Sequence, residues 1–188
     1  MAKLDGLEEK PLTLSVGRGH RQPKGNMRMT IYFDADFSRR SSKSTSGLVV
    51  RGVMGEILAS KTVIHSAISF LFVAEAQACL QAIQLGILIR FNSLAIVGDS
   101  RTVIKKCQTT DPDKSIIGAL IRDIQRKKFH FQEIDFQFIH RSENECAHNN
   151  AHEALKRGEG KYLVGAIPDY IRRALKNDGR GTQIEVVS

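Results

Sequence analysis

The sequence has few cysteines and no long apolar run. Its three cysteines, Cys79, Cys107 and Cys146, are an odd number at wide spacings. This arrangement does not suit a disulfide framework and is typical of reduced thiols in an intracellular protein, in the nucleus or the cytoplasm. No stretch reaches the roughly 18 apolar residues of a membrane-spanning helix, and the N-terminal residues lack the apolar stretch of a secretory signal. We therefore expect no membrane partner.

Acidic residues are in deficit. The 188 residues include 28 Lys and Arg against 20 Asp and Glu, which gives a formal net charge of +8. This excess favours an anionic partner. The hydrophobic fraction of 41% is ordinary for a globular protein and excludes disorder throughout. The length suits one domain of roughly 100–150 residues with tails, and we expect a monomer.

The chain divides into three predicted parts. Residues 1–28 are predicted to be a mobile basic arm, because residues 17–25 are rich in glycine and basic groups and show no apolar periodicity. Residues 29–172 are predicted to be the folded domain, and residues 173–188 a C-terminal tail. We find no internal repeat, and the one low-complexity stretch is the serine-rich segment 41–46.

Apolar periodicity predicts strands and helices along residues 29–157. The predicted strands span residues 29–34, 48–53, 57–64, 94–97 and 131–139. The predicted helices span residues 72–89, 101–107 and 143–157, with Ser100 as a cap, and a further helix begins at Asp111 and Pro112. Three hairpin-linked strands therefore precede strands that are joined through helices. This order predicts an α/β protein with a mixed sheet and helices packed on it.

Two acidic residues follow strands, and a third lies on the most apolar helix. Asp34 ends the first predicted strand, and Asp99 follows the fourth. Ligands gather at the carboxyl ends of parallel strands, so these carboxylates meet if the two strands are parallel neighbours. Glu75 shares a helix face with small residues, which lets its helix sit close to the sheet. Three acids together repel one another unless a hard cation such as Mg²⁺ lies between them, although each alone would suit a surface or cap position.

Five segments, in the order of the predicted elements, resemble the type 1 ribonuclease H domain. They are Ile31–Asp34, Ser46–Ala59, Ala74–Ala82, Val97–Ser100 and His140–His148. More narrowly, they resemble the plant reverse-transcriptase-like form of this domain, which occurs alone or at the ends of retroelement proteins. Residues 167–171 are similar to the segment that follows the domain in that branch, so the resemblance covers roughly residues 29–172.

The resemblance implies a ribonuclease H-like fold, with a five-stranded mixed sheet of order 3-2-1-4-5 flanked by helices. It also implies a metal-dependent endonuclease that hydrolyses the RNA strand of RNA/DNA hybrids with two Mg²⁺ or Mn²⁺ ions. Asp34, Glu75 and Asp99 fall on the family's first three metal-binding acids, and His148 falls on its fourth. These four residues are the candidate catalytic and metal-binding residues, with Asp34 shared by both ions.

Departures from the family pattern favour an alternative function. His148 stands in place of an acid, and Ala35 stands where glycine is usual. Asn149 and Asn150 replace apolar or small residues. The alternative is a catalytically weak or inactive ribonuclease H-like domain that binds nucleic acid. A retroelement remnant without a selected role is a third hypothesis.

Basic residues supply candidate nucleic-acid contacts. Arg39, Arg40 and Lys43 lie in the loop after the first predicted strand, which should border the active-site edge, and there they would bind phosphate groups. A second basic cluster, residues 126–128, lies at a predicted helix C-terminus, where cations also complement the helix dipole.

Histidines and cysteines raise the competing hypothesis of a zinc site. His148 and His152 lie four residues apart on one predicted helix, close to Cys146. The segment lacks the catalytic glutamate of zinc proteases and a paired cysteine, so we predict that His152 faces solvent. His140 ends the last predicted strand, either as a structural residue or as a group that moves protons near the site. Cys79 is predicted to be a core residue.

Overall fold

The computed structural model describes residues 28–164 and 184–186. Residues 1–27 of the predicted arm, residues 173–183 and 187–188 of the predicted tail, and residues 167–171 all lie outside the described residues. Arg28, the last residue of the predicted arm, forms ion pairs with Glu133 and Asp135 at 3.0 and 2.9 Å. Arg28 is therefore attached to the folded domain.

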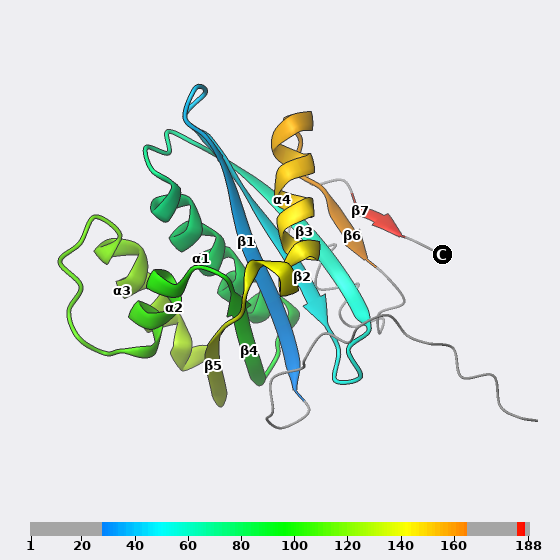
Figure 1. Ribbon diagram of the computed structural model, residues 1–188. Helices are drawn as coiled ribbons and strands as arrows, with labels where there is room; N and C mark the ends of the chain where they lie inside the picture. The colour runs from blue at the N-terminus through cyan, green and yellow to red at the C-terminus, as the bar shows by residue number, and fades with distance from the viewer. Residues whose placement is uncertain (1–27, 165–183, 187–188) are drawn as a thin grey trace, which may run out of the picture.

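The described elements follow nearly the predicted order (Figure 1). The strands are β1 (Met29–Ser38), β2 (Lys43–Arg51), β3 (Ile57–Ser66), β4 (Ser93–Gly98), β5 (Glu133–Phe138), β6 (Tyr162–Val164) and β7 (Ile184–Val186). The α-helices are α1 (Leu71–Ile89), α2 (Arg101–Gln108), α3 (Gly118–Lys127) and α4 (Glu145–Arg157). Two short 3-10 helices, η1 (Lys128–His130) and η2 (Arg141–Glu143), precede β5 and α4.

One mixed sheet contains all the described strands, in the order β5-β4-β1-β2-β3-β6-β7. Strand β2 is antiparallel to β1 and β3, whereas β4 is parallel to β1 and β5. The predicted five-stranded sheet of order 3-2-1-4-5 is therefore confirmed. The sequence did not predict the two short strands beyond β3, of which β6 is antiparallel to β3 and β7 is parallel to β6.

Helices cover both faces of the sheet. Helix α1 contacts β1 and β2 on one face, and α4 crosses β1, β2 and β3 on the other (Figure 1). Side chains alternate between these faces along β1. Ile31, Phe33 and Ala35 are buried in the hydrophobic core with α1, while Asp34 and Asp36 reach residues of α4. One face of β1 thus packs in the hydrophobic core, and the other face carries Asp34 of the candidate site.

Helix α1 is the central helix of the core. Most of its residues from Ala74 to Ile89 are buried, and Glu75 is its one charged residue. A Cβ atom on Gly86 would lie 2.4 Å from Cδ2 of Leu94, so the small-residue face brings α1 against β4 as predicted. By length and composition α1 is able to cross a membrane, but 61% of its apolar window is buried in the domain, as in the core helix of a soluble protein.

The predicted start of this helix at Asp111 and Pro112 is wrong, because α3 begins only at Gly118. The Asp113 carboxylate accepts a hydrogen bond from the Ser115 backbone N–H at 2.9 Å and pairs with Lys106 at 2.9 Å. These contacts stabilise a turn in the segment that the periodicity assigned to a helix. Ser100 does precede α2, but its side chain makes no capping hydrogen bond.

The first hairpin is longer than predicted. Strand β1 continues to Ser38 and β2 begins at Lys43, with the two residues paired, so the connecting turn covers residues 39–42. Asp34 therefore does not end its strand. Its pairing with β4 nevertheless stops at Phe33 and Gly98, so Asp34 is the first β1 residue beyond the end of β4.

Substitution of Gly47 should loosen α4 from the sheet. A Cβ atom at this position would lie 2.2 Å from the Ala147 carbonyl oxygen and 2.6 Å from the Ala151 nitrogen, both in the α4 backbone. We expect Gly47→Ala to lower the free energy of unfolding by about 1–3 kcal/mol in urea denaturation, because the α4 backbone cannot move away without disrupting its packing on β2. The control is Gly158→Asn, at a φ of +70° with nothing within 4 Å of the added Cβ, where the loss should be small. Equal losses at the two positions would contradict the close packing.

Candidate active site

Three carboxylates converge where β1, β4 and α1 meet. One ligand atom from each of Asp34, Glu75 and Asp99 lies within 4.8 Å of the others. Asp34 and Asp99 are neighbours because the parallel pairing of β1 and β4 ends one residue before each of them. Glu75 is the fifth residue of α1. The three acids converge as predicted. Asp34 does so because it follows the last residue of β1 that pairs with β4, and not because it ends its strand.

Two of these acids are buried, and the charges of all three interact. Asp34 is fully buried, Glu75 is 8% exposed and Asp99 is partly exposed. Burial and the nearby charge of Asp99 raise the pKa of Asp34 to about 6, against the opposing effect of its hydrogen bond to His148. Burial and then the charges of Asp34 and Asp99 raise the pKa of Glu75 well above its ordinary value. The group therefore resists holding its full negative charge without a compensating cation.

The donor set suits a hard divalent cation. Oδ1 of Asp34, Oε2 of Glu75 and Oδ2 of Asp99 are buried atoms without a hydrogen-bond partner in the described part of the chain. Buried carboxylate oxygens without a partner are costly, and a metal ion between them removes that cost. Mg²⁺ and Mn²⁺ prefer such oxygen ligands. The three residues thus fit a divalent metal ion by chemistry, proximity and their unpartnered atoms.

His148 contacts the acidic group through Asp34. Its Nδ1 lies 2.7 Å from Oδ2 of Asp34, so the ring N–H donates to the carboxylate. Nη2 of Arg141 lies 2.8 Å from the same ring nitrogen and 3.2 Å from Nε2. The structure therefore brings His148 to the candidate site, as the resemblance implies. The side chain is 28% exposed and lies outside the three-carboxylate group itself.

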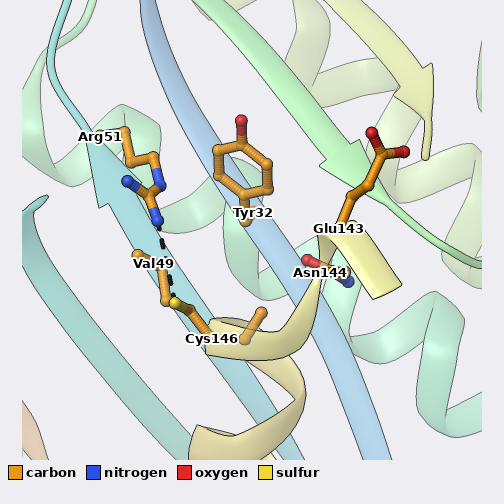
Figure 2. Close-up of a pocket in the computed structure, with 7 residues that line it drawn as sticks. Tyr32, Val49, Arg51, Glu143, Asn144 and Cys146 are labelled. Atoms are coloured by element: carbon orange, nitrogen blue, oxygen red, sulfur yellow. Dashed lines mark hydrogen bonds between the residues drawn. The ribbon is translucent and has the colours of Figure 1, made fainter. Parts of the chain in front are cut away.

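Two backbone contacts position the start of α4 beside Asp34. The buried Asn144 donates a hydrogen bond from Nδ2 to the Phe33 carbonyl oxygen at 2.9 Å. Figure 2 shows Asn144 on the turn that enters α4, next to β1. At Gly47, the backbone of α4 comes down onto β2. No sequence pattern singled out Asn144, because the predicted helix 143–157 included it as an ordinary helix residue.

A second carboxylate–imidazole pair lies beside the first. Nδ1 of His152 is 2.7 Å from Oδ2 of Asp36, and the rings of His148 and His152 stack with centroids 6.1 Å apart. The prediction that His152 faces solvent is therefore wrong in part, since its side chain is 45% exposed but paired. The spacing of these residues in the sequence could have predicted this second pair. Asp36 follows Asp34 by two strand positions and His152 follows His148 by one helical turn, so both pairs share a face.

The zinc hypothesis gains no support. Among the described residues, the three carboxylates are the one group whose ligand atoms meet closely enough to hold a metal ion. Cys146 instead faces Arg51, whose Nη2 lies 3.8 Å from its sulfur (Figure 2). Cys79 is fully buried, with its sulfur 3.8 Å from that of Cys107, which confirms it as a core residue.

The remaining candidates divide between surface and structural positions. Arg39 and Arg40 are exposed in the hairpin turn, and Lys43 is exposed at the start of β2. Lys128, from the second basic cluster, contacts the Cys107 carbonyl oxygen, and its Nζ lies 4.9 Å from the centroid of a phenylalanine ring. It is therefore a structural residue. His140 caps η2 and packs edge-on against a neighbouring ring at 5.5 Å, which agrees with its structural interpretation.

The sheet order, its two helical layers and the carboxylates beside the end of β4 define a ribonuclease H-like domain. Residues 32–154 match the reverse transcriptase-like family, and the chain belongs to that family. No curated protein sequence matches the chain.

Solved ribonuclease H structures share the fold. RNase H1 from the halophilic archaeon Halobacterium salinarum is 24% identical, with a TM-score of 0.62 over 69% of this chain and 98% of that one. The N-terminal RNase H domain of a Mycobacterium tuberculosis protein is 18% identical, with a TM-score of 0.63 over 69% and 94%. LC11-RNase H1, isolated from compost and solved in complex with an RNA/DNA hybrid, is 17% identical, with a TM-score of 0.61 over 70% and 99%.

Without divalent ions, Asp34→Asn should stabilise the fold at neutral pH. The folded-state pKa of Asp34, about 6, lies above the ordinary value of 3.8, so the folded state binds this proton more tightly than the unfolded chain does. The stability that comes from this proton is complete below about pH 4 and is lost as the pH rises through about 6. We expect the variant to gain about 2 kcal/mol in free energy of unfolding at pH 7.5, and little at pH 4.

Urea denaturation in EDTA at the two pH values measures this gain. Asp111→Asn is the control, because Asp111 is exposed in the loop before α3 and lies outside the acidic group. Added Mg²⁺ should raise the stability of the wild type at pH 7.5 more than that of Asp34→Asn. A variant that gains the same amount at both pH values would contradict the charge repulsion.

Proposed function

We propose that this domain is a divalent-metal-dependent endonuclease that hydrolyses the RNA strand of RNA/DNA hybrids. The observation that carries the proposal is the group formed by Asp34, Glu75 and Asp99, whose ligand atoms lie within 4.8 Å of one another. The likeness to a ribonuclease H1 solved with an RNA/DNA hybrid supports this choice of substrate. A protein of this class reads the 2′-hydroxyls and backbone shape of a hybrid rather than its base edges.

The three acids and His148 would hold two Mg²⁺ or Mn²⁺ ions. Such a pair, when bound, activates a water molecule and stabilises the leaving 3′-oxygen. Asp34 is the residue proposed to be shared, because it is fully buried between the other groups and keeps Oδ1 free of hydrogen bonds. Glu75 and Asp99 would complete one coordination shell. His148 holds Oδ2 of Asp34 in place and would assist at the second ion.

One contact favours the alternative, a weak or inactive nucleic-acid-binding domain. Where the family pattern has a fourth acid, His148 donates to Asp34, and Arg141 lies 2.8 Å from the same ring. Both groups reduce the negative potential at Asp34 and thereby compete with a cation. The second candidate function is therefore nucleic-acid binding through the same face, with little or no hydrolysis.

Neutralising Asp99 should separate cleavage from binding. We expect Asp99→Asn to abolish cleavage of the RNA strand in a labelled hybrid with Mg²⁺ or Mn²⁺, because one metal ligand loses its charge. Binding of the hybrid in EDTA should stay within about twofold of the wild type, since phosphate contacts remain. Asp111→Asn should cleave like the wild type. Equal cleavage by wild type and Asp99→Asn would show that the assigned site is wrong, and a wild type that binds hybrid without cleaving it would support the alternative.

The ratio of the cleavage rates in Mn²⁺ and Mg²⁺ should show whether His148 acts at the metal ions. A neutral imidazole adds no negative charge, and Mn²⁺ accepts nitrogen ligands more readily than Mg²⁺ does. We therefore expect faster cleavage in Mn²⁺ than in Mg²⁺, and a narrower gap in His148→Asp. Metal titrations of both proteins measure it. If the ratio of the two rates is the same in both proteins, His148 does not act at the metal ions.

A further inference from the structure

Three consecutive apolar side chains are exposed where α1 begins. Phe70, Leu71 and Phe72 are 43%, 52% and 40% exposed, and we call them the Phe70–Phe72 patch. The rings of Phe70 and Phe72 stack with centroids 5.5 Å apart and planes at 15°. Phe70 occupies the N-cap position, where polar residues stabilise a helix, and it makes no capping hydrogen bond. The patch therefore contributes little to the core or to the helix end, and large exposed apolar groups that gather in this way mark binding surfaces.

The patch borders the acidic site. Leu71 and Phe72 precede Glu75 by four and three residues, so they lie one turn earlier on the same side of α1. A molecule that reaches Glu75 along this side of the helix passes over the patch.

The patch also adjoins the basic hairpin turn. The Ile68 backbone N–H donates to the Ser42 carbonyl oxygen at 3.0 Å, which ties the loop before α1 to the turn at residues 39–42. Figure 1 shows that α1 begins at the end of the domain where β1 turns into β2. Arg39, Arg40 and Lys43 are exposed there, and none of them takes part in an ion pair with another described residue. Aromatic rings and unpaired cations thus share one edge.

This combination fits single-stranded nucleic acid. Aromatic side chains bind unpaired bases by stacking, which tolerates any sequence, while Arg and Lys bind the phosphates between them. Bases inside a duplex already stack on one another and offer no free face. A protein partner would also suit an apolar patch, but the adjacent positive charge favours a polyanion.

We propose that the Phe70–Phe72 patch binds an unpaired nucleotide of the substrate, with Arg39, Arg40 and Lys43 at its phosphates. The domain then prefers hybrids with a single-stranded extension over blunt hybrids of the same duplex. This inference rests on the proposed function for the identity of the duplex, and it names a feature of the substrate that the acidic site does not determine.

Binding of the full chain to two labelled hybrids in EDTA tests the inference without cleavage. One hybrid is blunt, and the other carries a short single-stranded extension on an identical duplex. We expect the extended hybrid to bind more tightly, and Phe72→Ala to weaken its binding about tenfold with little change for the blunt hybrid. Phe72→Tyr should bind like the wild type because it keeps a ring for stacking, whereas Phe72→Leu should behave like Phe72→Ala.

The matched control is Phe129→Ala, which removes a phenylalanine that is 90% exposed on η1. It should bind both hybrids like the wild type. The inference is overturned if Phe72→Ala leaves the extended hybrid unaffected or weakens both hybrids equally. It is also overturned if Phe72→Leu binds like the wild type, since an apolar contact without stacking is what a protein partner would use.

Cleavage assays in Mn²⁺ separate this inference from the proposed function. A wild type that cleaves both hybrids at equal rates, with patch variants that match the wild type on each, contradicts the inference alone. A wild type that prefers the extended hybrid through Phe72 but cleaves neither supports the inference and contradicts the nuclease activity. A protein that binds neither hybrid overturns both.

Discussion

The carboxylates of Asp34, Glu75 and Asp99 repel one another, and the packing of the surrounding elements must overcome this repulsion. Each carboxylate has a buried oxygen without a hydrogen-bond partner in the described chain, and burial together with neighbouring charge raises the pKa of two of them. Such an arrangement lowers stability, so the rest of the fold must hold it together. A cation bound among the three oxygens would relieve this repulsion, and that relief would increase the affinity of the site for the cation. The same feature that costs stability is therefore the feature that supports a metal-dependent function.

Small residues let the surrounding elements approach closely enough to hold the acids. Gly86 brings α1 against β4, and Gly47 lets the backbone of α4 come down on β2. A Cβ atom on Gly98 would lie 2.4 Å from the ring of Phe33, at the point where β1 and β4 stop pairing. Each glycine lies next to an element that carries an acid or His148. Close packing of the backbone thus sets the distances within the site.

Periodicity and motif spacing predicted most of the fold. They also predicted that the three carboxylates meet, although the strand position assigned to Asp34 was wrong. The alternation in β1 and the apolar stripe of α1 were clear because both elements are buried on a regular period. The turn at Asp113 was missed because a local side-chain contact delays the start of the helix to Gly118, although the apolar pattern had placed the start at Asp111. Asp34 was expected at a strand end, whereas it lies where the pairing with β4 ends. Contacts such as Asp36 with His152 depend on the approach of α4, which no local pattern reveals.

Crystals grown with Mn²⁺ would show directly whether the three carboxylates bind a metal ion. An anomalous difference map locates the ion independently of any activity. We expect a manganese peak among the carboxylate oxygens of Asp34, Glu75 and Asp99, and no peak there in Asp99→Asn crystals at the same ion concentration. A map without a peak at these residues, or with an unchanged peak in the variant, would contradict the assignment of the site.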